Sequence, residues 1–259
     1  MKAELGDATL HYEVIGEGPD VLLSHGVIEN SSSWDDVVAR LAERFRVTCY
    51  DARGRGGSGG GDTPFGFAEL AEDVEALARH LGLVKFVHVG HSMGGRVALE
   101  HAVRHPRRLA GLVVASARAE APSAAGRSRL EALIESVRAE GSGAGVDMWT
   151  SPADDYYARA REISEANPVP GTTRALATLV AMDSFVPRLG SVDVPVLVVA
   201  GDRDVDYLHS AEVMAERIPV SSLRVLPGVG HFPNLQCPAA FADQVIRFAE
   251  TGLRGQAQR

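Results

Sequence analysis

The sequence lacks any apolar run close to the roughly 20 residues that a membrane-spanning helix needs. Residues 1–7 also lack the apolar segment of a secretory signal. Basic residues are in the minority, because 26 Lys and Arg stand against 34 Asp and Glu and leave a net charge of −8. Proteins that bind nucleic acid need a basic face. We therefore expect a cytoplasmic protein that binds neither membranes nor nucleic acid.

Cysteine is scarce as well. The two cysteines, Cys49 and Cys237, make no disulfide framework and have no metal-ligand spacing, so we expect both to be buried thiols. No other motif indicates a metal or a cofactor, and no internal repeat is present. The oligomeric state is left open, a homodimer included.

Short apolar segments alternate with stretches of helical periodicity, which predicts an α/β fold with a mostly parallel sheet and helices on both faces. The predicted strands are residues 8–14, 20–24, 45–50, 86–89, 109–115, 194–200 and 223–226. The predicted helices that pair with them are residues 34–44, 67–81, 93–105 and 239–250.

Almost eighty residues separate the strand that ends at residue 115 from the one that begins at 194. Connections in α/β units are usually far shorter. Helical patterns at residues 128–139, 153–166 and 172–182 occupy this stretch. We therefore predict a core domain of residues 1–117 and 191–259, with a helical cap inserted at residues 118–190.

The central motif is the run GHSMGG at residues 90–95. A serine between a strand end and a helix start, with glycines two residues to either side, is typical of a nucleophile elbow. In so tight a turn a Cβ at position 90 or 94 would collide with neighbouring backbone. The pattern also surrounds Ser58, but that copy lies in a glycine-rich run with no helical pattern after it. We predict that Ser92 is the nucleophile and that Ser58 lies in a loop.

A serine hydroxyl needs a base to remove its proton, and the base needs a carboxylate to orient it. In an open α/β sheet such groups follow the carboxyl ends of strands. Asp204 comes soon after the strand at 194–200, and His231 soon after the strand at 223–226. The chain order Ser, Asp, His is the one associated with the elbow. We predict a catalytic triad of Ser92, Asp204 and His231.

The competing residues fit these roles less well. Asp202 is the second choice for the acid, and Asp206 lies in the same loop. His88 lies within a strand, and we expect His91 to point away from the neighbouring nucleophile across the elbow. His209 is expected to begin a helix.

An oxyanion hole needs two backbone donors aimed at the developing charge. We predict the N–H groups of Val27, which follows His25-Gly26, and of Met93, which follows the nucleophile. Large side chains of the cap are candidates for lining a substrate pocket, with packing between cap helices as the alternative: Met148, Trp149, Tyr156, Tyr157, Met182 and Phe185. Cap arginines, Arg129 among them, could pair a substrate carboxylate, but helical spacing beside glutamates favours a solvated face.

Together these motifs resemble the α/β-hydrolase superfamily. The matching segments are His25-Gly26, Asp51-x-Arg53-Gly54-x-Gly56-x-Ser58, GHSMGG, Gly201-x-x-Asp204 and Gly230-His231. The resemblance implies an eight-stranded, mostly parallel sheet with an inserted cap. The run GHFPNL at residues 230–235 looks like the branch that contains 3-oxoadipate enol-lactonase and related esterases.

The sequence thus favours a serine hydrolase of small carboxylic esters or lactones, acting through an acyl-enzyme without a cofactor or a metal. Two kinds of alternative stay open. The same triad could hydrolyse carbon–carbon bonds, or act as a cofactor-free haloperoxidase or perhydrolase. The chain could also be a hydrolase-fold ligand receptor that has kept the triad.

Overall fold

The computed structural model describes residues 1–254 of the chain, and the side chains of residues 1–251. Within this range the strands form a single eight-stranded sheet in the order β1-β2-β4-β3-β5-β6-β7-β8. β2 runs antiparallel to both β1 and β4, and the remaining neighbours are parallel. The predicted eight-stranded, mostly parallel sheet is confirmed. The strands are β1 (Lys2–Leu5), β2 (Ala8–Ile15), β3 (Asp20–Ser24), β4 (Arg46–Tyr50), β5 (Phe86–His91), β6 (Leu109–Ala115), β7 (Val196–Gly201) and β8 (Ser221–Leu226).

The central strands are continuous apolar runs because helices cover them on both sides. Every residue of β6 and β7 is buried, as expected for parallel strands with two covered faces. Neighbouring residues of β3 belong to opposite halves of the core, with Leu22 on one side and Val21 and Leu23 on the other. The sequence pattern does not reveal β1, which has four residues and a single buried side chain, Ala3.

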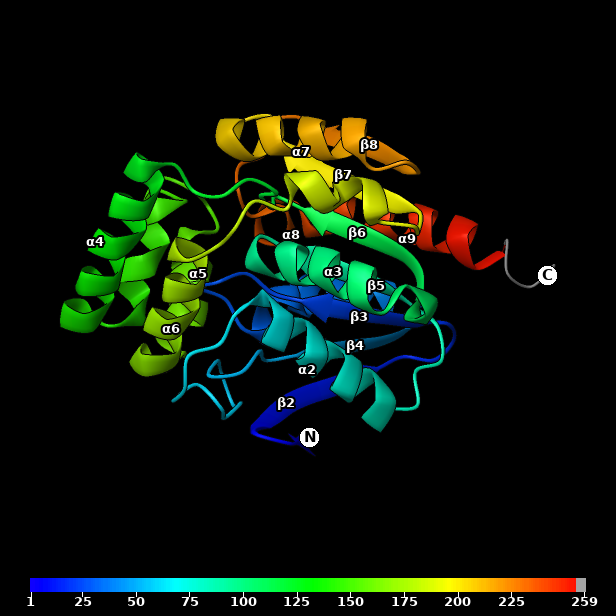
Figure 1. The fold of residues 1–259 in the computed structure, drawn as a ribbon, viewed down its shortest axis with the longest axis horizontal. Coiled ribbons are helices and arrows are strands. Elements are labelled where there is room, and N and C mark those ends of the chain that lie inside the picture. Colours follow the sequence, from blue (N-terminus) through cyan, green and yellow to red (C-terminus); the bar gives the residue numbers. More distant parts are fainter. Residues whose placement is uncertain (255–259) are drawn as a thin grey trace.

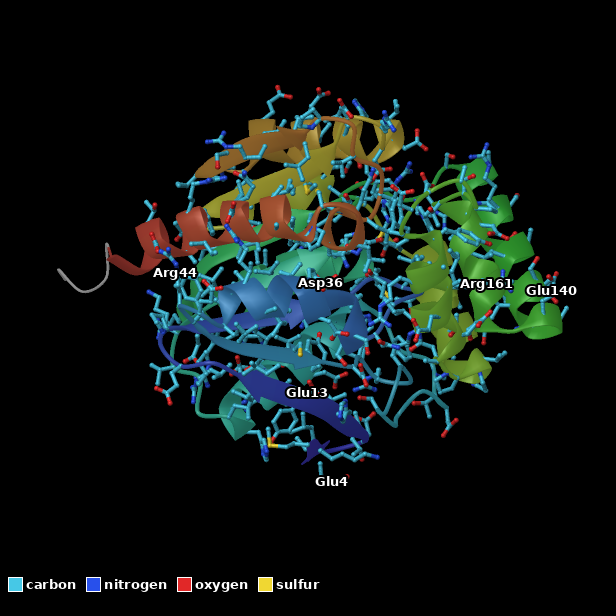
Figure 2. The ribbon with its side chains drawn as sticks, turned by 180° about the vertical axis from the view of Figure 1, so that it is seen from behind. Glu4, Glu13, Asp36, Arg44, Glu140 and Arg161 are labelled. Carbon is cyan, nitrogen blue, oxygen red and sulfur yellow. The ribbon has the colours of Figure 1, made fainter. Side chains whose placement is uncertain are left out.

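Helices lie on both faces of the sheet (Figure 1). Two of them pack against one face and three against the other. On the first face α1 packs against α9, and an ion pair of 2.6 Å between Arg40 and Asp243 joins them. Figure 2 shows this face, with Asp36 of α1 beside α9. On the second face lie α2, α3 and α7. The helices are α1 (Asp35–Leu41), α2 (Phe67–His80), α3 (Met93–Arg104), α7 (Val205–Arg217), α8 (Pro233–Gln236) and α9 (Pro238–Arg254).

Three further helices follow β6 and lie together beyond the carboxyl ends of the parallel strands (Figure 1). They are α4 (Ala124–Glu140), α5 (Tyr157–Glu165) and α6 (Val169–Val180), here called the α4–α6 group. The helical pattern predicted from residue 172 begins earlier in the structure, because α6 starts at Val169 and has a proline in its first turn. A proline is tolerated there because the N–H groups of the first turn have no partner within the helix.

A buried polar network ties the α4–α6 group to the sheet. The Arg55 guanidinium, fully buried, donates to Thr172 Oγ1 at 2.6 Å. Asn167 donates to the Ile28 carbonyl at 3.2 Å and accepts from the Gly56 N–H at 2.9 Å. These contacts hold the start of α6 against the loops that follow β3 and β4. Across residues 1–254, no helix combines the length and the apolar character needed to cross a membrane.

Candidate active site

The chain turns sharply between β5 and α3, and Ser92 lies at that turn. Its backbone has φ 52° and ψ −115°, in the left-handed region that non-glycine residues rarely adopt. A Cβ on Gly90 would meet the Gly94 carbonyl, and one on Gly94 would meet the Ser24 carbonyl. The tight turn predicted around GHSMGG is confirmed, and so is its need for glycine.

The three residues predicted as a triad lie within hydrogen-bond distance of one another. His231 Nε2 is 3.0 Å from Ser92 Oγ, and His231 Nδ1 is 2.8 Å from Asp204 Oδ2. Asp204 comes just after β7 and His231 in the loop after β8, so both meet Ser92 at the carboxyl edge of the sheet. With the Nδ1 proton donated to Asp204, the Nε2 lone pair faces the serine hydroxyl and can accept its proton.

His231 is enclosed by aromatic rings. Tyr207 lies 4.3 Å away between ring centroids, and Trp149 stacks on the imidazole at 5.8 Å. Burial lowers the pKa of His231, and the Asp204 carboxylate opposes this shift. The imidazole is therefore neutral at pH 7, the form that a general base requires.

The amides predicted for the oxyanion hole both lie beside Ser92. Met93 is the first residue of α3, and a Cβ on Gly26 would come within 3.3 Å of Ser92 Cβ, which puts the Val27 loop against Ser92. Among the described residues, neither the Val27 nor the Met93 N–H donates to a protein acceptor. Both are therefore free to bind a ligand oxygen.

A second histidine–carboxylate pair lies behind the triad, and sequence reasoning missed it. His91 Nδ1 is 2.6 Å from Glu29 Oε2, and His91 Nε2 is 2.7 Å from the His231 carbonyl. Glu29 also accepts from the Gly26 N–H at 2.5 Å and from Asn234 Nδ2 at 2.8 Å. The pair therefore links the loop after β3, the turn at Ser92 and the loop that carries His231.

The charges of this pair follow from its geometry. Burial by itself would raise the pKa of Glu29, but His91 and Asn234 lower it to about 2. Burial likewise opposes charge on His91, yet Glu29 raises the pKa of this histidine. Both ring nitrogens of His91 face acceptors, the Glu29 carboxylate and the His231 carbonyl, so the ring carries a proton on each nitrogen. The pair is a salt bridge almost without exposure to solvent. As predicted, His91 points away from Ser92, because both its ring nitrogens bond elsewhere.

A cavity of about 390 Å³ opens over Ser92 and His231. Among the predicted pocket residues Met148, Trp149 and Met182 line it. Several lining residues come from the α4–α6 group and its connections: Arg118, Pro122, Gly126, Arg129, Leu130 and Leu179. The others come from the loop after β7, the start of α7, α3 and the loop after β8: Arg203, Asp204, Val205, Asp206, Tyr207, Met93, Arg96 and Gly230.

Three predicted pocket residues lie outside this lining. Phe185 is wholly buried, with its ring 4.3 Å from the Arg96 guanidinium. The Tyr156 ring packs 6.0 Å from Phe232, and the Tyr157 hydroxyl donates to Asp147 on the surface. Phe185 and Tyr156 therefore pack against other side chains, whereas the Tyr157 hydroxyl bonds at the surface.

The competing candidates have structural roles. Ser58 Oγ donates to the Asp51 carbonyl at 2.6 Å, so this second G-x-S-x-G serine holds a loop, as predicted. Asp202 accepts from the Gly228 N–H at 2.7 Å. Cys49 is buried as expected, whereas Cys237 is only half-buried. In the part of the chain that the structure describes, no three His, Cys, Asp or Glu side chains are grouped to hold a metal ion.

The architecture of the sheet and the geometry around Ser92 match one known fold. The eight-stranded sheet, the sharp strand–turn–helix around Ser92 and the chain order Ser, Asp, His are those of the α/β-hydrolase fold. The chain matches the model of the alpha/beta hydrolase family over residues 21–244. It belongs to that family, and the resemblance inferred from the sequence is confirmed.

Its relatives include enzymes of several named activities. The chain is 34% identical over 256 residues to a putative carbamate hydrolase, RutD, of Agrobacterium fabrum, a match that covers 92% of this chain and 97% of the relative. An esterase from Thermogutta terrifontis, solved with malate bound, has a TM-score of 0.88 at 28% identity and covers 95% of this chain and 94% of its own. The enol-lactonase from Burkholderia xenovorans has a TM-score of 0.87 at 26% identity. This match covers 96% of this chain and 99% of the enol-lactonase chain.

Proposed function

We propose that this protein is a serine hydrolase of small carboxylic esters or lactones. The observation that carries the proposal is the continuous hydrogen-bonded series from Ser92 Oγ through His231 to Asp204, at 3.0 and 2.8 Å, on the wall of a cavity. The enol-lactonase and the esterase among its structural relatives support the choice of bond.

Acylation begins when Ser92 Oγ attacks the carbonyl carbon of the substrate while His231 Nε2 takes the hydroxyl proton. Asp204 holds the imidazole in the required tautomer and stabilises its positive charge. The N–H groups of Val27 and Met93 donate to the oxyanion of the tetrahedral intermediate; losing one such donor typically costs about 2.7–4 kcal/mol of transition-state stabilisation. His231 then gives the proton to the leaving alkoxide oxygen as the bond between that oxygen and the carbonyl carbon breaks. The acyl group stays bound to Ser92 Oγ.

Deacylation repeats these steps with water. His231 removes a proton from a water molecule, whose oxygen attacks the acyl carbon, and the same proton then goes to Ser92 Oγ as the carboxylic acid departs. In a lactone the leaving oxygen stays attached to the acyl chain, so a single hydroxy acid leaves. The neutral imidazole that burial favours is the form needed at the start of each half-reaction.

We further propose that residues 118–190 act as a cap over the site. The α4–α6 group and its flanking loops supply the apolar side of the cavity, through Leu130, Met148, Leu179 and Met182. A small cavity of this kind suits a compact, partly apolar acyl group. The cap thereby selects the substrate, while the core carries the reaction.

The test is labelling with a fluorophosphonate probe, combined with turnover of p-nitrophenyl acetate. We expect the wild type and Ser58→Ala to be labelled and active, and Ser92→Ala to lose both properties while keeping the same circular dichroism spectrum. Ser58→Ala is the matched control, because it removes the serine of the second G-x-S-x-G pattern. A folded wild type that neither reacts with the probe nor turns over the ester would contradict the proposal.

A further inference from the structure

The cavity over Ser92 carries an excess of positive side chains. Four arginines line it, Arg96, Arg118, Arg129 and Arg203, whereas its acidic lining residues among those described are Asp204 and Asp206. The chain as a whole has the opposite balance, with a net charge of −8. The positive lining is therefore a local feature and does not reflect the composition.

Two of the four arginines have partners that neutralise them. Arg96 donates to Glu100 at 3.3 Å, with its guanidinium between the rings of Phe67 and Phe185 at 5.0 and 4.3 Å. Arg118 lies 3.0 Å from Asp206. Asp204, the other acidic residue of the lining, is engaged with His231. No lining carboxylate is then left for Arg129 and Arg203.

Arg129 and Arg203 form no side-chain hydrogen bond or ion pair within the described residues. The charge of Arg203 helps to lower the pKa of Asp154, but the two side chains form no ion pair. The Asp154 carboxylate instead accepts from Thr150 Oγ1 and from the Ser151 N–H. Arg129 comes from α4, and Arg203 from the loop that also carries Asp204. Two unpaired cations thus face one cavity from two different parts of the chain.

We propose that Arg129 and Arg203 bind a carboxylate of the substrate, so that the natural substrate is an ester or lactone with a free carboxylate away from the bond that is cleaved. This inference rests on the proposed hydrolase function. A guanidinium presents its N–H donors in a planar fork that matches both oxygens of a carboxylate. The apolar lining residues Leu130, Leu179 and Met182 then contact the chain between the carboxylate and the scissile carbonyl.

A pair of probe substrates tests the proposal: p-nitrophenyl hydrogen glutarate, which ends in a carboxylate, and p-nitrophenyl methyl glutarate, in which that end is capped. We expect the wild type to prefer the acid, by about tenfold in kcat/KM and chiefly through KM, as for one or two partly exposed charge pairs. High salt should reduce the preference, because exposed charges are screened.

Three variants locate the effect. Arg129→Gln and Arg203→Gln should each reduce the preference for the acid several-fold, and the double variant should abolish it. Arg138→Gln is the matched control, since it removes the same charge from the same helix but its guanidinium pairs with Glu135 outside the cavity. We expect Arg138→Gln to keep the wild-type preference. Thermal melting establishes that all the variants fold.

The outcomes separate the two proposals. A wild type that turns over both esters without preferring the acid would refute the carboxylate site and leave the hydrolase function standing. A double variant that keeps the full preference would refute the site as well. A folded wild type that hydrolyses neither ester and resists the fluorophosphonate probe would overturn both proposals.

Discussion

Glu29 Oε2 lies 2.6 Å from His91 Nδ1, in a place where both side chains are at most 2% exposed. The other His91 nitrogen bonds to the carbonyl of His231, and the same Glu29 oxygen accepts from the Gly26 N–H. One buried ion pair thus joins the backbone of the proposed base to the loop of the proposed oxyanion hole. We infer that it positions the site without touching the substrate.

Removing the carboxylate should therefore destabilise the fold. Glu29→Gln leaves a buried imidazole without its counter-ion, and loss of one member of a buried ion pair typically costs about 3–5 kcal/mol. The measurement is the free energy of unfolding in urea. The double variant Glu29→Gln/His91→Gln should lose clearly less than the sum of the two single losses, because the pair acts as a unit. Simple additivity would count against the pairing.

The acid of the triad can be tested with two neighbouring aspartates. Asp204→Asn should lower kcat by roughly ten-thousandfold, as the corresponding change does in trypsin, because the amide favours the wrong tautomer of His231. Asp202→Asn should keep most of the activity, since its side-chain oxygen can still accept from the Gly228 N–H. Steady-state turnover of p-nitrophenyl acetate decides between them. An inactive Asp202→Asn beside an active Asp204→Asn would overturn the assignment.

The dependence of activity on pH follows from the neutral imidazole. Burial lowers the pKa of His231 from its ordinary value, which is about 6.5 for a histidine. Full activity is therefore expected above that value, and kcat/KM should fall as the pH drops through the lowered pKa, where Nε2 becomes protonated. The profile is measured with a neutral ester. If kcat/KM reached half of its maximum only at pH 7 or higher, the pKa of His231 would not be lowered, and the prediction would be wrong.

Acid should weaken the fold through His88, which lies away from the site. Its ring is wholly buried with one hydrogen bond, to Ser24 Oγ at 2.8 Å, and burial lowers the pKa of His88 to about 3. Below pH 6.5 the unfolded chain binds a proton that the folded chain excludes, so stability falls by about 1.4 kcal/mol per pH unit from this group. His88→Gln should remove that share of the slope in urea unfolding at pH 6, 5 and 4. If the free energy of unfolding of His88→Gln falls with pH as steeply as that of the wild type, His88 is not the group responsible.

The residues that meet at the proposed triad could be predicted because a parallel sheet imposes their positions. Ser92, Asp204 and His231 each follow a strand, and strands of one direction end at one edge. The positions of the central strands along the chain could be predicted too, because continuous apolar runs are typical of parallel strands covered on both faces.

The remaining features depend on tertiary proximity, which no short pattern encodes. Glu29 and His91 are 62 residues apart, and the one local clue is that Glu29 closely follows His25-Gly26. Phe185 and Trp149 look alike as aromatic residues of the predicted cap, yet Phe185 packs on Arg96 and Trp149 lines the cavity. Which way a side chain faces is decided by packing, and packing is set by the whole chain.

The proposed hydrolase function requires that Ser92 becomes acylated during turnover, and mass spectrometry can detect this acyl group. The enzyme is mixed briefly with p-nitrophenyl acetate, quenched in acid and digested, and the acetylated peptide is identified by mass spectrometry. We expect an acetyl group on Ser92, absent from Ser92→Ala and still present in Ser58→Ala. Turnover with the acetyl group on another residue, or with full activity retained in Ser92→Ala, would contradict it.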